Sequence, residues 1–435
     1  MAQQKKLSRI KSSVLSRSFS LAKLGLHAGL KYTSAKLSNS TLDEFVKSQA
    51  ILLTKEFGEL KGSLMKAGQM LSMYGEHFFP PEVVRTLKTL QSDSPTIEWS
   101  HMLRHLEKYL APELIAELDI NPESIGNASM GQVHLATVIS SGQKIALKIQ
   151  YPDLEKAIDS DVAALKKILS FSKILPSGLD LTEIFEEIKM MLKQELDYFL
   201  EAEQTTHYRK LIENDKRYVV PAVIERYSNG RVLATEYVEG LKSDHSLIQS
   251  LSAARRNKLS ENFLDLYFSE IFHWNFVQTD PHLGNYKIQI DSMGDDKLVL
   301  LDFGATKKFE SDFIAAYRKM IKGAVLEDSE IFLTGAMALG FVVASDSPEY
   351  IKTFQSFCYE TVEPFKSIGN YNWKTNDLPK RVVKNAIQFK NFDLRAPPRE
   401  ILFLDRKTAG VFTFLSVLGA DINARKIIDP YLNDV

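Results

Sequence analysis

The chain has 435 residues, enough for two to four domains, and its 44% hydrophobic and 25% charged content is ordinary for a globular protein with a large core. Its formal net charge of −1 provides no overall field that would select nucleic acid as a partner. The single cysteine, Cys358, excludes a disulfide framework within the chain and a cysteine-based metal site, which fits a reduced cytoplasmic or matrix-side compartment.

The first segment, residues 1–42, contains many basic residues and no acidic residue, with apolar residues interleaved at rough helical spacing. Basic amphipathic segments bind anionic membrane surfaces, so we expect membrane-surface contact, with a solvated tail or a targeting peptide as alternatives. The longest apolar run, residues 332–344, is shorter than the roughly 18–20 residues that span a bilayer. Membrane association is therefore expected to be peripheral.

The next segment, residues 43–120, is predicted to be a helical extension, because apolar residues recur at spacings of three and four. One stretch in it, LMKAGQMLSM at 64–73, is unusual. Gly68 costs roughly 1 kcal/mol relative to alanine inside a helix, while Lys66 and Gln69 lie three residues apart on one face. Plain packing, with Gly68 permitting close helix contact and Lys66 reaching water, is the simplest explanation from this stretch alone.

A change of period marks a smaller, mainly β lobe at 121–240. SMGQVHLATV and QKIALKIQY alternate apolar and polar residues around a turn and predict a hairpin. Helices are expected at 153–172 and 181–214, followed by strand-like pieces at 217–227 and 231–240. A mainly helical lobe at 241–435 follows, and it contains the hairpin NYKIQI–KLVLLDF. The prediction is an α+β, two-lobed fold with a ligand cleft at the lobe junction.

Three polar residues in the second lobe suggest phosphate chemistry. Asp280 and Asn285 lie five residues apart in QTDPHLGN, and Asp302 follows a hairpin in LLDFG. Two carboxylates and an amide make the oxygen-rich site that Mg²⁺ on a nucleotide triphosphate requires. The spacing matches the catalytic loop and D-F-G motif of protein kinases, with Asp280 in the position of the catalytic base.

The matching residues of the first lobe lie upstream. Lys148 ends IALK as in the kinase V-A-I-K strand, and is expected to bind phosphates and pair with an acidic residue of a helix. The candidates for that partner are Glu195, Asp197 and Glu201. The Gly-rich loop of kinases is represented by Gly126, Gly131 and Val133, with Ala128 in place of the middle glycine. Glu236 and Val238, in RVLATEYVEG, are also assigned to nucleotide binding.

Two kinase features are missing from the sequence. The residues before Asp280 read VQT instead of ending in the H-R of H-R-D, and no A-P-E segment follows D-F-G at short range. Without an activation segment there is no evident platform for a peptide substrate. The motifs predict ATP and Mg²⁺ binding but argue against an ordinary protein kinase.

Together these segments resemble the UbiB/AarF-type atypical kinases, a family linked to ubiquinone (coenzyme Q) biosynthesis. The resemblance covers roughly residues 45–430. It is carried by KAGQ (66–69), NASMGQVH (127–134), IALKIQYP (145–152), ELDYFLEAE (195–203), and QTDPHLGN with LLDFGA, and it extends to the region 397–425.

The resemblance implies a protein-kinase-like fold whose K-x-G-Q helix covers the site where a peptide would bind. It implies that Lys66 and Gln69 of this helix face the phosphates and that Lys66 pairs with Glu195 and Asp197. It also implies that Glu201 pairs with Lys148. Asn285 and Asp302 are implied to hold Mg²⁺. The family's loop is commonly A-A-A-S, whereas this chain reads Gly126-Asn127-Ala128-Ser129. Two of the alanines that the resemblance associates with nucleotide preference are therefore absent.

The implied activity is that of an ATPase more than a protein kinase, stimulated by anionic membrane lipid and quinone-like lipid. We therefore expect an atypical kinase/ATPase that supports ubiquinone biosynthesis, with quinone-biosynthesis proteins as possible partners. The alternatives are a small-molecule or lipid phosphotransferase and a nucleotide-binding scaffold. The sequence leaves the phosphoryl acceptor and the oligomeric state open.

Overall fold

The computed structural model describes residues 66–68, 70–71, 97–128, 130–171, 182–386, 389, 392 and 398–433. The basic segment, most of the predicted helical extension, Gln69 and Ser129 lie outside these described residues. The described chain forms two compact units. The first holds the residues up to His207 together with Pro221–Tyr237, and the second holds Tyr208–Val220 together with Val238 onward.

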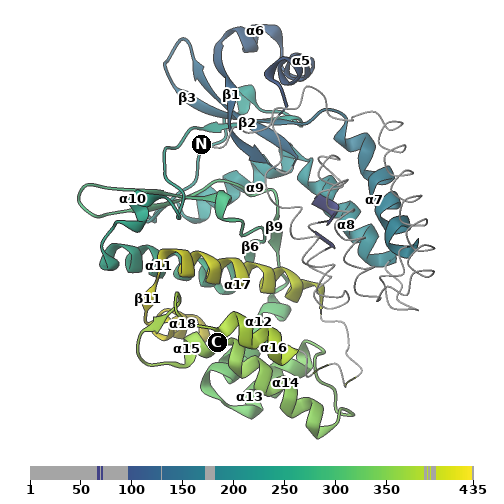
Figure 1. Cartoon of the computed structure of the whole chain (residues 1–435), viewed down its shortest axis with the longest axis vertical. Coiled ribbons are helices and arrows are strands. Elements are labelled where there is room, and N and C mark those ends of the chain that lie inside the picture. The colour runs from purple at the N-terminus through teal and green to yellow at the C-terminus, as the bar shows by residue number, and fades with distance from the viewer. Residues whose placement is uncertain are drawn as a thin grey trace, which may run out of the picture. The chain divides into compact units, whose positions relative to one another are not determined.

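The first unit is built on an antiparallel sheet with strand order β1–β2–β3–β5 (Figure 1). The strands are β1 (Leu118–Ala128), β2 (Gly131–Val138), β3 (Lys144–Gln150) and β5 (Val232–Glu236). The predicted alternation is present in β3, where Ile145, Leu147 and Ile149 are fully buried while Lys148 lies on the opposite face. The sequence prediction missed most of β1, because its residues lack a clear alternation of apolar and polar side chains.

Helices cover this sheet and extend beside it. They are α5 (Trp99–Tyr109), α6 (Pro112–Ala116), α7 (Leu154–Phe171), α8 (Thr182–Glu195) and α9 (Tyr198–Leu211), with a 3₁₀ turn η1 (Glu225–Tyr227). Helices α7 and α8 lie side by side (Figure 1). The single helix expected at 181–214 is interrupted, because Asp197 accepts a hydrogen bond from the Leu200 amide at 3.0 Å and so starts a new helix, α9.

The described residues of the second unit form three small sheets. Strand β8 (Lys297–Leu300) lies between β4 (Tyr218–Val219) and β7 (Tyr286–Gln289), β6 (Phe276–Gln278) pairs with β9 (Thr306–Lys308), and β10 (Tyr371–Asn372) pairs with β11 (Asp421–Ile422). The β7–β8 hairpin is where the sequence predicts it. Strands β6 and β9 were not predicted, since three residues are too few to establish a period.

The remainder of the second unit is helical. Its helices are α10 (Ser246–Gln249), α11 (Ala253–Phe268), the π-helix η2 (Ser269–His273), the 3₁₀ turn η3 (Leu283–Asn285), α12 (Ser311–Leu326), α13 (Ser329–Ala338), α14 (Pro348–Thr361), α15 (Glu363–Lys366), α16 (Leu378–Ala386), α17 (Arg399–Leu418) and α18 (Ala424–Asn433). Within the described parts of the chain, none of the helices is both long and apolar enough to cross a bilayer.

Helices α11 and α17 run beside each other and form the core that supports the catalytic loops (Figure 1). Phe263 of α11 stacks on Phe414 of α17 with ring centroids 4.1 Å apart, and Tyr286 of β7 packs edge-on against Phe263 at 4.8 Å. One turn earlier on α17, a side chain at Gly410 would collide with Pro281, so only glycine permits this close approach. Helix α17 therefore packs directly against the predicted catalytic loop.

Candidate active site

Lys148 is held by an ion pair within the first unit. Its Nζ lies 2.6 Å from Oε1 of Glu201 in α9 and 5.3 Å from the centre of the Tyr198 ring. The Glu201 side chain is only 3% exposed, so its carboxylate depends on the lysine for charge compensation. Of the three acidic residues considered as partners for Lys148, the structure brings Glu201 to it.

Lys66 forms a second buried ion pair in this unit. Its Nζ lies 2.7 Å from Oε1 of Glu195, the last residue of α8, and its side chain is 4% exposed. Asp197, the other carboxylate that the resemblance assigns to Lys66, instead caps helix α9. The helical residues around Lys66 are buried as well, including Ala67 and Leu71.

The predicted nucleotide loop lies at the end of the β1–β2 hairpin. Ala128 pairs with Gly131 and Gly126 with Val133, so strand pairing continues to the tip. A Cβ at Gly131 would come within 3.0 Å of the Ile149 carbonyl oxygen, which explains why glycine is needed there. At Gly126 the nearest atom to such a Cβ is 3.9 Å away, so packing does not demand glycine at this position.

Glu236 and Val238 lie where the chain leaves the first unit. Glu236 ends β5, and Val238 begins the second of the two segments that make up the second unit. The Glu236 amide donates to the Ala222 carbonyl at 2.9 Å, and its Oε2 accepts from the Ala222 amide at 2.9 Å. These bonds give the Glu236 side chain a structural role that the sequence prediction did not anticipate.

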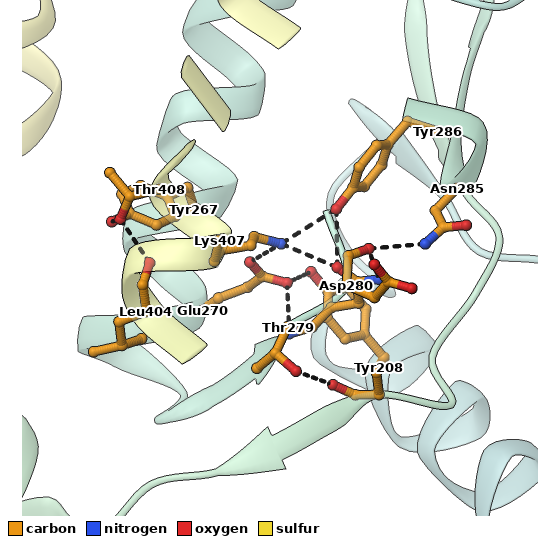
Figure 2. A network of polar contacts seen from close by, with 12 residues as sticks. Tyr208, Tyr267, Glu270, Thr279, Asp280, Asn285, Tyr286, Leu404, Lys407 and Thr408 are labelled. Carbon is orange, nitrogen blue, oxygen red and sulfur yellow. Dashed lines mark hydrogen bonds and ion pairs between the residues drawn. The ribbon is translucent and has the colours of Figure 1, made fainter. Parts of the chain in front are cut away.

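The second unit brings together the three residues predicted from the catalytic-loop and D-F-G motifs. Asn285 Nδ2 donates to the carbonyl oxygen of Asp280 at 2.8 Å (Figure 2). Asp302 follows β8, and because Tyr286 pairs with Leu300, the residues just outside this pair meet at the end of the hairpin. Accordingly, the Leu301 amide donates to the Asn285 carbonyl at 3.0 Å.

This arrangement fits a hard cation bound to phosphates. The amide nitrogen of Asn285 is held by the Asp280 carbonyl, so Asn285 would offer its amide oxygen to a metal ion, and Asp302 would add a carboxylate. The described residues include no group of three or more His, Cys, Asp or Glu side chains that could form an all-protein metal cage. One carboxylate and one amide suit Mg²⁺, which obtains its other ligands from water and nucleotide phosphates.

Asp280 has a partner that the sequence analysis missed. Nη2 of Arg406, in α17, lies 2.6 Å from Oδ1 of Asp280, and both side chains are largely buried. The position directly before Asp280 is Thr279, whose hydroxyl donates to the Ala305 carbonyl at 2.5 Å. Arg406 thus reaches Asp280 from a position 126 residues later in the sequence. No local motif could reveal it.

Comparison with known proteins agrees with this geometry. The family model described as the ABC1 atypical kinase-like domain matches residues 89–334, more than half of the chain. The chain belongs to the ABC1 atypical kinase-like family. The resemblance to UbiB-type atypical kinases that the sequence motifs indicate is therefore confirmed.

Several curated relatives match this ABC1-family chain at 30% identity, among them the following two. They are "Atypical kinase COQ8, mitochondrial" of Saccharomyces cerevisiae, over 97% of this chain and 85% of the yeast protein, and "Atypical kinase COQ8B, mitochondrial" of Rattus norvegicus, over 94% and 78% respectively. Among solved structures, the Rv3197–erythromycin complex of Mycobacterium tuberculosis is similar with a TM-score of 0.62 at 24% identity, over 92% of this chain and 97% of that one. The expected kinase-like fold is confirmed.

A buried polar network lies behind the catalytic loop of this ABC1-family chain (Figure 2). Glu270 of the π-helix η2 and Lys407 of α17 form an ion pair at 2.6 Å, with side chains only 1% and 2% exposed. The Tyr208 hydroxyl donates to Glu270 Oε1 at 2.8 Å. Burial, reinforced by the Glu270 charge, raises the pKa of Tyr208 well above its ordinary value, so this phenol remains a donor at physiological pH.

Proposed function

We propose that this chain is an atypical kinase/ATPase that binds Mg-ATP and supports ubiquinone biosynthesis at a membrane surface. The observation that carries the proposal is the presence, in one ABC1-family chain, of the complete polar set of a phosphoryl-transfer enzyme. In the first unit this set is Lys148 paired with Glu201. In the second unit it is Asp280, Asn285 and Asp302.

Each group has a role in the proposed reaction. Lys148 binds phosphate oxygens, and Glu201 holds its ammonium group in place. Asn285 and Asp302 would hold Mg²⁺, which neutralises the charge that develops on the transferred phosphoryl group. Asp280 accepts the proton of the attacking hydroxyl or water, and Arg406 fixes the orientation of its carboxylate.

The proposed setting is the matrix side of the mitochondrion, at a membrane that contains anionic lipid and quinone-like lipid. The mitochondrial names of both curated relatives support this compartment. The ubiquinone role rests on the UbiB-type resemblance, and quinone-biosynthesis proteins are the proposed partners. The absence of acidic residues from 1–42 supports peripheral attraction to anionic lipid.

We further propose that the K-x-G-Q helix occludes the peptide site, so that the chain does not phosphorylate proteins. Two observations support this idea. Lys66 is buried and paired with Glu195, and no A-P-E segment follows the D-F-G motif at short range in the sequence. A small molecule or lipid is therefore the alternative acceptor if the phosphoryl group is not passed to water.

The test is ATP hydrolysis with and without anionic liposomes for wild type and Asp302→Asn. We expect wild-type turnover that rises with liposomes and is lost in Asp302→Asn, because the amide binds Mg²⁺ weakly. Asp295→Asn, which removes a charge from an exposed turn of the same unit, serves as the matched control and should behave as wild type.

The same reactions, extracted into organic solvent after incubation with γ-labelled ATP, identify the acceptor. Label in a lipid product would favour the phosphotransferase alternative. Nucleotide-dependent thermal stabilisation without turnover would favour a scaffold. Equal, negligible hydrolysis in every sample would overturn the proposed activity.

A further inference from the structure

Gln278 lies at the centre of the polar contacts behind the catalytic loop. It is the last residue of β6 and only 3% exposed. Its Nε2 donates to the main-chain carbonyl of Asp280 at 2.7 Å and to that of Asp302 at 3.2 Å. One side chain therefore holds the backbone of both the base residue and the metal-ligand residue.

The orientation of this amide is fixed by its neighbours on the other side. Gln278 Oε1 accepts from the Tyr286 hydroxyl at 2.9 Å and from Lys407 Nζ at 3.4 Å. A lysine ammonium can only donate and a main-chain carbonyl can only accept. If the amide were flipped, its nitrogen would face the ammonium and its oxygen would face two carbonyl oxygens, so only one orientation satisfies every partner.

The ion pair behind Gln278 holds both Lys407 and the main chain of β6. Oε2 of Glu270 pairs with Lys407. Its Oε1 accepts from the Tyr208 hydroxyl at 2.8 Å and from the main-chain N–H of Gln278 at 3.3 Å. Glu270 belongs to a π-helix, a local irregularity that is frequent at functional sites. Buried ion pairs seldom add net stability, so a role in orienting their neighbours accounts better for this one.

We propose that Gln278 is a positioning residue that couples the catalytic loop to the D-F-G loop, with Tyr286 and the Glu270–Lys407 pair fixing its amide. Its effect on turnover rests on the proposed Mg-ATP function. Gln278 acts through the two carbonyls, so it sets where the Asp280 carboxylate and the Asp302 carboxylate stand relative to each other. This chain lacks the arginine of the kinase H-R-D motif, and Gln278 contacts both loops.

The decisive variant is Gln278→Glu, which keeps the shape of the side chain. One carboxylate oxygen would face Lys407 and Tyr286, and the other would face two carbonyl oxygens with no proton to donate. We expect kcat to fall roughly 10- to 100-fold, since displacement of catalytic groups by about 1 Å has effects of this size. The Mg²⁺ concentration for half-maximal activity should rise, because the Asp302 carbonyl is no longer held.

A second readout does not depend on activity. The amides of Thr279 and Leu301 are bonded across the two loops, to the Ala305 and Asn285 carbonyls at 3.1 and 3.0 Å. In Gln278→Glu these amides should exchange with deuterium faster than in wild type. Gln289→Glu, at a half-buried position in β7 of the same unit, is the control and should leave turnover, Mg²⁺ dependence and exchange unchanged.

The two proposals fail in different ways. If wild type neither binds nor hydrolyses ATP, the proposed function is overturned, while amide exchange still tests the coupling by Gln278. If wild type is active and Gln278→Glu retains its kcat, Mg²⁺ dependence and exchange rates, the positioning role is wrong. Should Gln278→Glu fail to fold, Tyr286→Phe, which removes one donor without adding charge, must give the same changes to a smaller degree; wild-type behaviour of that variant would overturn the role.

Discussion

Gly410→Ala tests whether the close approach of α17 governs the catalytic loop. A Cβ at position 410 would lie closer than 3.0 Å to both Cβ and Cγ of Pro281. Carbon atoms in contact normally lie about 3.5–4.0 Å apart, so α17 and the loop must separate by about 1 Å. The proline ring cannot rotate aside as a flexible side chain would.

The separation should reach Arg406, which lies one turn before Gly410 on α17. Its Nη2 is 2.6 Å from Asp280 Oδ1, and a shift of about 1 Å would carry this pair beyond the hydrogen-bond range. We expect kcat to fall roughly 10- to 100-fold. Overpacking costs about 1–3 kcal/mol, and alanine in a helix returns about 1 kcal/mol relative to glycine, so the unfolding free energy should fall by at most about 2 kcal/mol.

The assay is initial-rate ATP hydrolysis at saturating Mg-ATP, with urea unfolding of the same samples. Gly323→Ala is the matched control, because its Cβ would collide with the Phe332 backbone between α12 and α13. It should lose stability but keep its kcat. Gly369→Ala, whose nearest neighbour is Ser367 Oγ at 3.8 Å, should change neither. Wild-type kcat in Gly410→Ala, or an equal loss in Gly323→Ala, would refute the reasoning.

Two further predictions concern buried charges. Lys407→Met leaves the Glu270 carboxylate buried without its cation and should lower the free energy of unfolding by about 3–5 kcal/mol. The double variant Glu270→Gln/Lys407→Met should recover most of that loss. Urea titrations that give the same loss of unfolding free energy in the single and the double variant would contradict this. Burial, followed by the charge of Lys108, lowers the pKa of His105 from 6.5 to about 4. As the pH falls, the His105 imidazole of the unfolded chain binds a proton before that of the folded chain does. The stability that comes from burying a neutral His105 is therefore complete above about pH 6.5 and is lost as the pH falls toward 4. Thermal midpoints measured across that range should show the loss in wild type and in a His101→Gln control, and a smaller loss in His105→Gln.

Much of the site could be predicted because its motifs are local. The alternation predicted for QKIALKIQY is present in β3, where Lys148 lies on the face opposite three buried residues. A hairpin between Asn285 and Asp302 was enough to predict that they meet, since strand pairing fixes the neighbours of its ends. In each case the residues concerned lie within one secondary-structure unit or at its edge.

The rest depends on contacts that sequence spacing does not encode. Arg406 reaches Asp280 across 126 residues because α17 packs on the loop, and nothing in QTDPHLGN indicates it. Asp197 looks equivalent to Glu195 in the sequence, yet the helix that starts beside it uses its carboxylate as a cap. In the sequence, Gln278 is only one of the residues that stand where kinases have H-R. Its role depends on hydrogen bonds to two main-chain carbonyls, which the sequence does not indicate.

The long sequence separation between the catalytic loop and α17 also has a meaning during synthesis. The ribosome produces Glu270 and Asp280 well before it produces Lys407 and Arg406, the cations of α17 that pair with them. Domains tend to fold from the N-terminus as they emerge. Until α17 is made, these two carboxylates lack the cations Arg406 and Lys407, and burying them without those cations is unfavourable. A chain cut short before Arg399 would lack both Arg406 and Lys407, so neither of these two ion pairs could form.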